Sequence, residues 1–308
     1  MYTLILVDYN SLKKTVNYIR HYTNQVKESK PVHIVLVDNG TQENLAYIES
    51  EFGIAEAIPN MVGGRTAYRF SNEDLCLIYC KYGENAGYAR GNNLGMQLAD
   101  AIFGDAYYII SNNDLILPDA FSFETVTTRF LQEPSVGVIG PKVIEVNGKA
   151  QTPRKKQSAF TKLIAWYWGV GPLRKYVDDI LYDPEGKPCQ WVSGCFFFAR
   201  AEAMRKIQGF DENTFLYAEE MILSARLQRI GYTTLYDPMF TIIHDHKEAY
   251  KSVDAKLKTI QMSFDSICYY YKTYCGTSAL MLLLAKFSFG LYKLLYPLWQ
   301  LTKEEGTN

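Results

Sequence analysis

YYIISNNDLILPDAF, residues 107–121, decides the fold, because an apolar run passes directly into Asn112, Asn113 and Asp114. A run of this kind predicts a buried strand, and open α/β folds bind their ligands where such strands end. Asp114 is therefore expected at the carboxyl edge of a sheet. A carboxylate in that position is a hard oxygen ligand that suits Mg²⁺ or Mn²⁺ bridging a diphosphate.

The first 39 residues predict a strand, a helix and a second strand. Two apolar runs, 2–7 and 32–37, enclose a segment in which apolar residues recur at helical spacing, at Leu12, Val16, Ile19 and Tyr22. A parallel crossover of this kind brings both strand ends, Asp8 and Asp38, to one edge of the sheet. Further strands are expected at 75–79, 106–111, 136–139, 191–199, 233–236 and 241–243. Helices are expected at 92–101, 121–131, 201–206 and 220–230, and residues 147–188 indicate an irregular, partly helical excursion.

Composition limits the class of protein. The chain has 308 residues, 48% of them hydrophobic, which is enough for one large domain or one and a half. A net charge of −1 argues against nucleic-acid binding by bulk electrostatics. Six cysteines form no CxxC pair and no signal peptide is recognised, so we expect a cytoplasmic protein whose thiols are small buried hydrophobes.

Several polar groups are expected to meet at the carboxyl edge of the sheet and form a nucleotide cleft. They are Asp8 and Tyr9, Asp38 and Asn39, Asp114, and the loop NAGYARGNN at 85–93. Within the loop, Gly87 and Gly91 would let the backbone approach a ligand and Arg90 would neutralise phosphate. A tight turn is the alternative interpretation, since the spacing is neither GxGxxG nor that of a phosphate-binding P-loop.

A second group of carboxylates lies in GFDENTFLYAEEMILSARLQRIGY, residues 209–232. Glu219 and Glu220 open an amphipathic stretch there and are candidates for a general base. The alternative is that they only compensate the positive end of the helix dipole.

The carboxyl-terminal segment 278–301 is strongly apolar, with Lys286, Lys293 and Gln300 on one helical stripe. This pattern favours an amphipathic helix in a membrane surface, with packing on the protein and membrane spanning as alternatives. Pro297 is expected to kink or end the helix.

Seven ordered motifs resemble one family, the inverting glycosyltransferases of family two, and in particular its rhamnosyltransferase-like members that build bacterial surface polysaccharides. They are VDYNS (7–11), VLVDNGT (35–41), ENAGYARGNNLG (84–95), SNNDLILPDAF (111–121), GVIGPKV (137–143), VSGCFFFARAEAM (192–204) and the segment from 209 to His244. The resemblance implies a GT-A fold with a mostly parallel sheet flanked by helices. Residues 1–250 would form the enzyme, with a nucleotide-sugar half (1–118) and an acceptor half (119–250), and residues 251–308 a helical, membrane-associating segment.

The same resemblance implies roles for individual residues. Asp114 would bind a divalent metal, with Asn112 at the first position of the metal motif and His244 as a further ligand. Asp38 would read the base, and the other donor contacts are expected from Asp8, Tyr9, Asn39, Gly87, Arg90, Asn93 and Asn113. Glu220 takes the place of the family's aspartate base. Two residues later the family has another acid, where this chain has Ile222, which puts its activity or acceptor type in doubt.

The expected function is sugar transfer from dTDP-rhamnose or a UDP-sugar to a glycan or lipid-linked glycan, at the inner face of the cell membrane. Acceptor handling is assigned to Glu219, Trp191, Arg154 and Trp166, with a solvated basic loop at 152–157 as the plainer alternative. A homodimer is left open. The rival functions are a nucleotidyl-type enzyme, which would need a glycine-rich basic loop that VDYNSLKK lacks, and a catalytically impaired saccharide or nucleotide-sugar binder.

Overall fold

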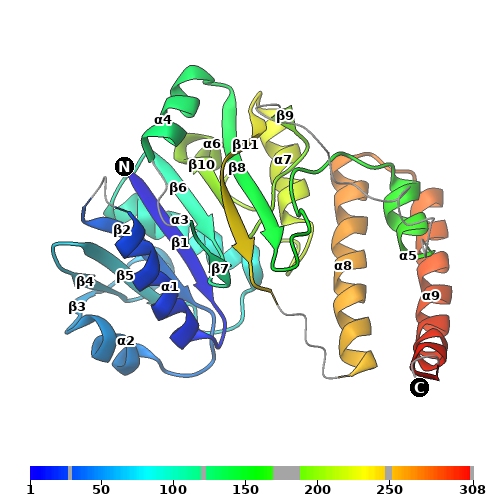
Figure 1. Ribbon diagram of the computed structural model, residues 1–308, viewed down its shortest axis with the longest axis horizontal. Helices are drawn as coiled ribbons and strands as arrows, with labels where there is room; N and C mark the ends of the chain where they lie inside the picture. Colours follow the sequence, from blue (N-terminus) through cyan, green and yellow to red (C-terminus); the bar gives the residue numbers. More distant parts are fainter. Residues whose placement is uncertain (27–29, 119–122, 169–187, 247–251, 306–308) are drawn as a thin grey trace.

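The computed structural model describes residues 1–26, 30–118, 123–168, 188–246 and 252–305, and of the last range only the backbone beyond Pro297. An 11-stranded mixed sheet with helices on both faces forms the body of the protein, and two long helices stand beside it (Figure 1). The strands are β1 Tyr2–Asp8, β2 Val32–Asp38, β3 Glu56–Ile58, β4 Ala67–Ser71, β5 Leu75–Lys81, β6 Tyr107–Ser111, β7 Leu115–Ile116, β8 Val136–Glu145, β9 Pro188–Cys189, β10 Phe196–Arg200 and β11 Thr233–His244. The α-helices are α1 Leu12–Gln25, α2 Leu45–Phe52, α3 Gly87–Ile102, α4 Phe123–Gln132, α5 Trp166–Trp168, α6 Ala201–Lys206, α7 Glu219–Arg229, α8 Val253–Tyr274 and α9 Ala279–Glu305.

The order of the sheet is β3-β4-β5-β2-β1-β6-β10-β8-β11-β7, with β9 paired to β11. The parallel first half expected from the sequence is confirmed, because β5, β2, β1 and β6 all run in the same direction. The sheet as a whole is mixed, because β10 lies antiparallel between β6 and β8. This insertion places the start of β10 opposite the end of β6, with Phe196 paired to Ser111.

Two apolar clusters cover the two faces of the sheet, as the period of two along a buried strand requires. Leu4 and Leu6 of β1 belong to the cluster that includes α1, and Ile5 belongs to the one that includes α3. The four residues that predicted α1 are all buried. Helix α3 lies unusually close to β1, because a Cβ on Gly95 would come within 2.5 Å of Ile5 and one on Gly91 within 2.7 Å of Val7. Gly91 therefore serves helix packing, which corrects its assignment to ligand approach.

The second half departs from the predicted elements. Strand β8 continues through Pro141 to Glu145, and the predicted strands 233–236 and 241–243 are one strand, β11. The strands tolerate Pro141 in β8 and Pro238 in β11 because their pairing shifts register between Tyr236 and Thr241. At this bulge no backbone N–H is needed for the ladder. Strand β10 begins at Phe196 and not at Trp191. Of the two alternatives expected at Pro297, a kink or an end, the end is wrong, because α9 continues past this residue.

Candidate functional site

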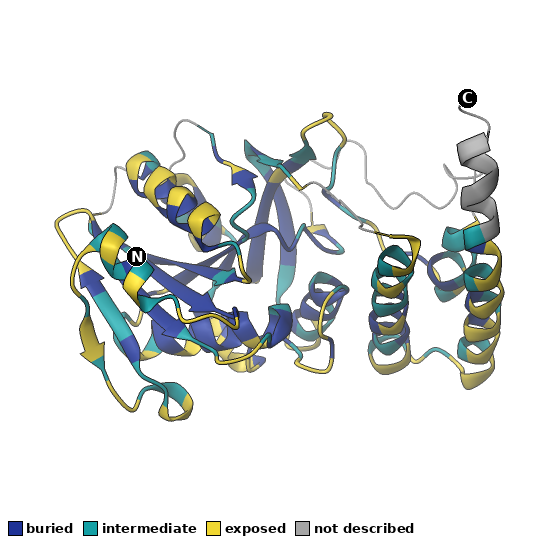
Figure 2. Ribbon diagram, turned by 90° about the horizontal axis from the view of Figure 1, so that it is seen from below, coloured by how far each residue is buried: buried dark blue, intermediate teal, exposed yellow. Residues whose placement is uncertain are grey.

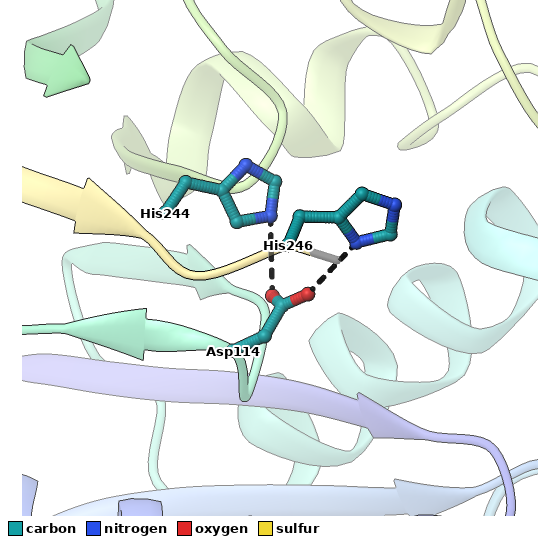
Figure 3. A group of neighbouring side chains, drawn as sticks. All are labelled: Asp114, His244 and His246. Atoms are coloured by element: carbon teal, nitrogen blue, oxygen red, sulfur yellow. Dashed lines mark hydrogen bonds and ion pairs between the residues drawn. The ribbon is translucent and has the colours of Figure 1, made fainter. Parts of the chain in front are cut away.

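Asp114 lies just after β6, where it meets two histidines from the end of β11 (Figure 3). Its Oδ1 is 3.3 Å from His244 Nε2, and its Oδ2 is 3.2 Å from His246 Nδ1. The antiparallel pairing of β11 with β7 brings these segments together, since His244 stands opposite Leu115. The ligand atoms of the three residues all lie within 4.8 Å of one another, a spacing that suits a single metal ion. His246 had no role in the sequence analysis.

The carboxyl group of Asp114 is ionised in this cluster, which suits a bound cation. Burial raises the pKa of Asp114, but its contacts with His244 and His246 lower it more, and the net pKa is well below the ordinary value. His244 Nδ1 lies 3.1 Å from Gln151 Oε1, and in the tautomer that carries its proton on Nδ1 the lone pair of Nε2 faces Asp114. Asp114 Oδ1 and His244 Nε2 are both buried without a hydrogen-bond partner. Two acceptors in this position suit a shared metal ion.

Asp8 organises the loop beneath this cluster. It has no exposed surface, and its carboxylate accepts hydrogen bonds from Ser11, Thr15 and Asn113. Asn113 Nδ2 also donates to Ser11 Oγ at 2.8 Å and Thr15 Oγ1 at 2.6 Å. Both side chains face this internal network, which fixes the backbone that leads into Asp114, and their contact with a donor stays a prediction.

Asp38 is buried in a hydrogen-bond network. Its carboxylate accepts hydrogen bonds from Gly40 N at 2.7 Å, Tyr79 OH at 2.8 Å and Asn44 Nδ2 at 2.9 Å. Asn39 is 1% exposed and donates to the carbonyl of Gly87 at 3.0 Å, while its Oδ1 has no hydrogen-bond partner among the described residues. Both residues hold the β2 edge in shape, and their contact with a base or donor stays a prediction.

The loop 85–93 divides into packed and accessible residues. Gly87 has φ +78°, and a Cβ there would come within 2.4 Å of Phe215 O, so this glycine is needed for loop packing. Asn93 is 5% exposed. Its side chain donates from Nδ2 to the carbonyl of Phe210 and accepts at Oδ1 from the backbone N–H of Phe210. Gly87 and Asn93 therefore have structural roles, and their contact with a donor stays a prediction. Tyr9 and the Arg90 side chain are about half exposed and stay accessible, with Arg90 3.6 Å from Glu212.

Two residues that precede β10, Gly194 and Cys195, connect Glu220 to the Asp114 segment by hydrogen bonds. Its Oε1 accepts a hydrogen bond from Gly194 N at 3.0 Å, and the next carbonyl, that of Cys195, accepts from Asn112 N at 2.8 Å. Burial raises the pKa of the Cys195 thiol to about 12, and the charges of Asp114 and Glu220 add to the rise. Both carboxylates therefore lie near one thiol. A Cβ at position 194 would be 2.7 Å from Glu220 Oε1, so a larger residue there would displace the Glu220 side chain.

Glu219 differs sharply from its neighbour. It is 7% exposed, and its Oε1 has no hydrogen-bond partner. Burial and, after it, the charge of Glu220 raise the pKa of Glu219 to about 8. The pair follows Tyr217 and Ala218, which have φ +73° and +66°, a left-handed conformation that costs non-glycine residues on the order of 1 kcal/mol each. Ile222 is 1% exposed in the apolar cluster between α7 and α8. The position at which the family has its further acid therefore faces α8.

The acceptor residues expected from the sequence differ in their surroundings. Trp191 is 5% exposed in that same cluster, and its contact with an acceptor stays a prediction. Arg154 pairs with it through the backbone and donates from Nε to Gln151 O at 2.8 Å. Trp166 carries the Lys162 ammonium over its ring at 4.4 Å. Residues 169–187 of the expected excursion lie outside the described residues.

Sequence comparison gives two kinds of relative. The profile of a family described as "Glycosyltransferase (GlcNAc)" matches residues 174–253. The chain is also 24% identical over 230 residues to the N-acetylglucosaminyl-diphospho-decaprenol L-rhamnosyltransferase of two Mycobacterium tuberculosis strains, covering 71% of this chain and 67% of that protein. Both comparisons make this chain similar to glycosyltransferases, and the longer match is to a bacterial rhamnosyltransferase.

Among solved structures, this rhamnosyltransferase-like chain resembles GalNAc-T7 in complex with UDP, GalNAc and Mn²⁺. The TM-score is 0.55 at 12% identity, over 88% of this chain and 49% of that protein, so the chain spans about half its length. At this identity the likeness establishes the fold alone, which is GT-A as expected.

Proposed function

We propose that this protein is an inverting glycosyltransferase that moves a sugar from a nucleotide-diphosphate donor to an acceptor hydroxyl in cell-surface polysaccharide synthesis. One observation supports this above all: a metal-type cluster and a candidate base approach each other through residues 194 and 195 at the carboxyl edge of a GT-A sheet. The relatives agree with transfer from a nucleotide sugar in cell-wall polysaccharide synthesis.

Glu220 is the proposed general base. It is only partly buried, and the Gly194 N–H orients its carboxylate. It would remove the proton of the acceptor hydroxyl, whose oxygen then attacks the anomeric carbon from the side opposite the leaving diphosphate. The configuration inverts and no covalent intermediate forms. Base assistance of this kind contributes about 10² to 10⁴ in rate.

A divalent ion, Mg²⁺ or Mn²⁺, is proposed at Asp114, His244 and His246, with Asn112 beside them. Two buried atoms without a hydrogen-bond partner among the described residues, Asp114 Oδ1 and His244 Nε2, support such a site, and GalNAc-T7 was solved with UDP and Mn²⁺. A bound ion would stabilise the negative charge of the departing nucleoside diphosphate. Gln151 would keep His244 in the ligating tautomer. Tyr9 and Arg90 are the accessible candidates for donor contact.

The donor is proposed to be dTDP-rhamnose or a UDP-sugar, and the acceptor a glycan or a lipid-linked glycan. The mycobacterial relative's name specifies rhamnosyl transfer to a sugar diphospho-lipid. A lipid diphosphate acceptor would reside at the cytoplasmic face of the membrane, and the exposed Lys155 and Lys156 next to Arg154 would meet its phosphates. The buried Ile222 keeps a second function in view, that of a saccharide or nucleotide-sugar binder with an impaired site.

Thermal unfolding with nucleotide sugars, with and without Mn²⁺, tests donor binding. A donor at one hundred times its dissociation constant stabilises the fold by about 2.7 kcal/mol. The donor found in this way then serves in turnover assays of wild type and Glu220→Gln. The proposal expects Glu220→Gln to lose at least 100-fold in kcat with donor affinity kept. A wild type that binds donor and transfers nothing to any acceptor would support the binder, and equal turnover of both proteins would exclude Glu220 as the base.

A further inference from the structure

One face of α9 is apolar and exposed to solvent, as the outer side of that helix shows in Figure 2. Its large side chains are each 41–73% exposed, and they are Leu280, Leu283, Leu284, Phe287, Leu291, Leu294 and Leu295. At 3.6 residues per turn these positions cover an arc of about 120° that carries no charged residue. An exposed apolar surface of this size marks an interaction site.

The opposite face of α9 is packed on the protein. Ala285, Phe289 and Tyr296 are buried, and the Phe289 ring stacks on Phe264 of α8 with centroids 4.0 Å apart and planes 5° from parallel. Tyr167 packs on the edge of the same Phe289 ring. A membrane-spanning α9 would strip this packing from α8. The segment 279–297 is apolar enough to span by composition, but the packed face holds it against a second helix that carries several charged residues.

The borders of the exposed face carry groups that favour a membrane–water interface. Lys286 and Lys293 stand on one border, and the Lys293 ammonium also lies 2.8 Å from Gln261 Oε1. On the other border Trp168, 40% exposed, donates from Nε1 to Ser288 Oγ at 2.8 Å and contacts Tyr292 edge-on. Lysines that reach the headgroups and aromatic rings at their depth anchor interfacial helices.

We propose that α9 lies in the plane of an anionic bilayer surface and inserts its exposed face, while its other face stays packed on α8. A second copy of the chain is the less favoured occupant. Two helices that pair in a coiled coil contact each other along a narrow apolar stripe with charged residues beside it. Leu283 and Leu295 make the exposed apolar face of α9 wider than such a stripe. The proposal rests on α9 and its neighbours alone, so it stands or falls separately from sugar transfer.

The full chain is tested by flotation with vesicles of phosphatidylcholine, with and without phosphatidylglycerol. Wild type should float with the anionic vesicles. The double substitution Leu284→Glu/Phe287→Glu should reduce partition by at least about 100-fold, since each buried side chain contributes about tenfold or more. Lys286→Gln should lower binding about fivefold, and only to anionic vesicles. Ile54→Glu/Leu131→Glu, at two exposed apolar positions of the sheet domain, is the matched control and should float like wild type.

Circular dichroism and thermal unfolding establish that each variant is folded before its partition is compared. Alkaline carbonate should release the bound chain, and retention would mean a spanning helix and overturn the in-plane arrangement. Wild type that fails to float, or a folded Leu284→Glu/Phe287→Glu variant that floats equally well, overturns the proposal. A lipid-free wild-type dimer that the double substitution dissociates, without vesicle binding, assigns the face to a second copy instead.

Discussion

Glu219 should make the stability of the protein depend on pH. Its pKa is raised from 4.5 to about 8 by burial and then by the charge of Glu220. The unfolded state loses this proton near pH 4.5, whereas the folded state keeps it until about pH 8. Between these values the folded state binds one proton more, so stability falls as pH rises through the window and does not change on this account below it.

The size of the effect follows from linkage. At 1.36 kcal/mol per pH unit, the separation of the two pKa values gives roughly 3–5 kcal/mol lost between pH 4.5 and pH 8. Glu219→Gln keeps the shape of the side chain and removes the titration. We therefore expect the variant to match wild type near pH 5 and to exceed it by several kcal/mol at pH 8, a difference of roughly 5–10 °C in Tm.

Urea and thermal unfolding, followed by circular dichroism from pH 5 to pH 9, measure this difference. Glu73→Gln, at an exposed turn position, is the matched control and should follow the wild-type curve. Parallel pH profiles for wild type and Glu219→Gln would refute the reasoning, because they would mean that the buried carboxyl ionises as freely in the folded state as in the unfolded chain.

Three further substitutions test the site. His246→Ala should weaken Mn²⁺ binding about 10- to 100-fold by calorimetry, as loss of a ligand or its support typically does, with the exposed His21→Ala as a control that binds normally. Gly194→Ala should lower kcat about 100-fold at unchanged stability, because the new Cβ displaces Glu220 from the N–H that orients it. A kcat equal to wild type would show that this contact is dispensable. Asp8→Asn should cost about 1–3 kcal/mol in chemical unfolding, since the donors around it lose a charged acceptor; no loss would mean the network is not a support.

The sequence predicts the first half of this fold well, because its strands are long apolar runs and α1 shows one clear apolar face. It also predicts the edge at which Asp114 lies. Side-chain direction is different: Asp8 and Asp38 end their strands as expected, but both turn inward to satisfy buried donors, and no pattern of residue types shows that turn. The bulge that lets β8 and β11 run past proline depends on a partner strand about a hundred residues away.

His246 could have been found from the sequence. It stands two residues after His244 at the end of an apolar strand, and alternate residues of an extended segment share a face. The acidic end of α7 was recognised, yet the contrast between Glu219 and Glu220 was not. One is enclosed by the neighbouring elements and the other reaches Gly194, which only the packed structure reveals.

The insertion of β10 between β6 and β8 joins the two halves of the protein in one continuous sheet. Hydrogen bonds run from β5 through β1 to β11 without a break, so the halves have no seam about which to swing open and shut. Any tightening around a bound molecule would come from the segments at the carboxyl edge of the sheet, where Tyr88 N, in the first turn of α3, already donates to Phe215 O in the segment before α7 at 3.2 Å. The sheet thus fixes the spacing between the Asp114 segment and residues 194–195, and in the proposed transfer reaction this spacing would set the distance between leaving group and attacking oxygen.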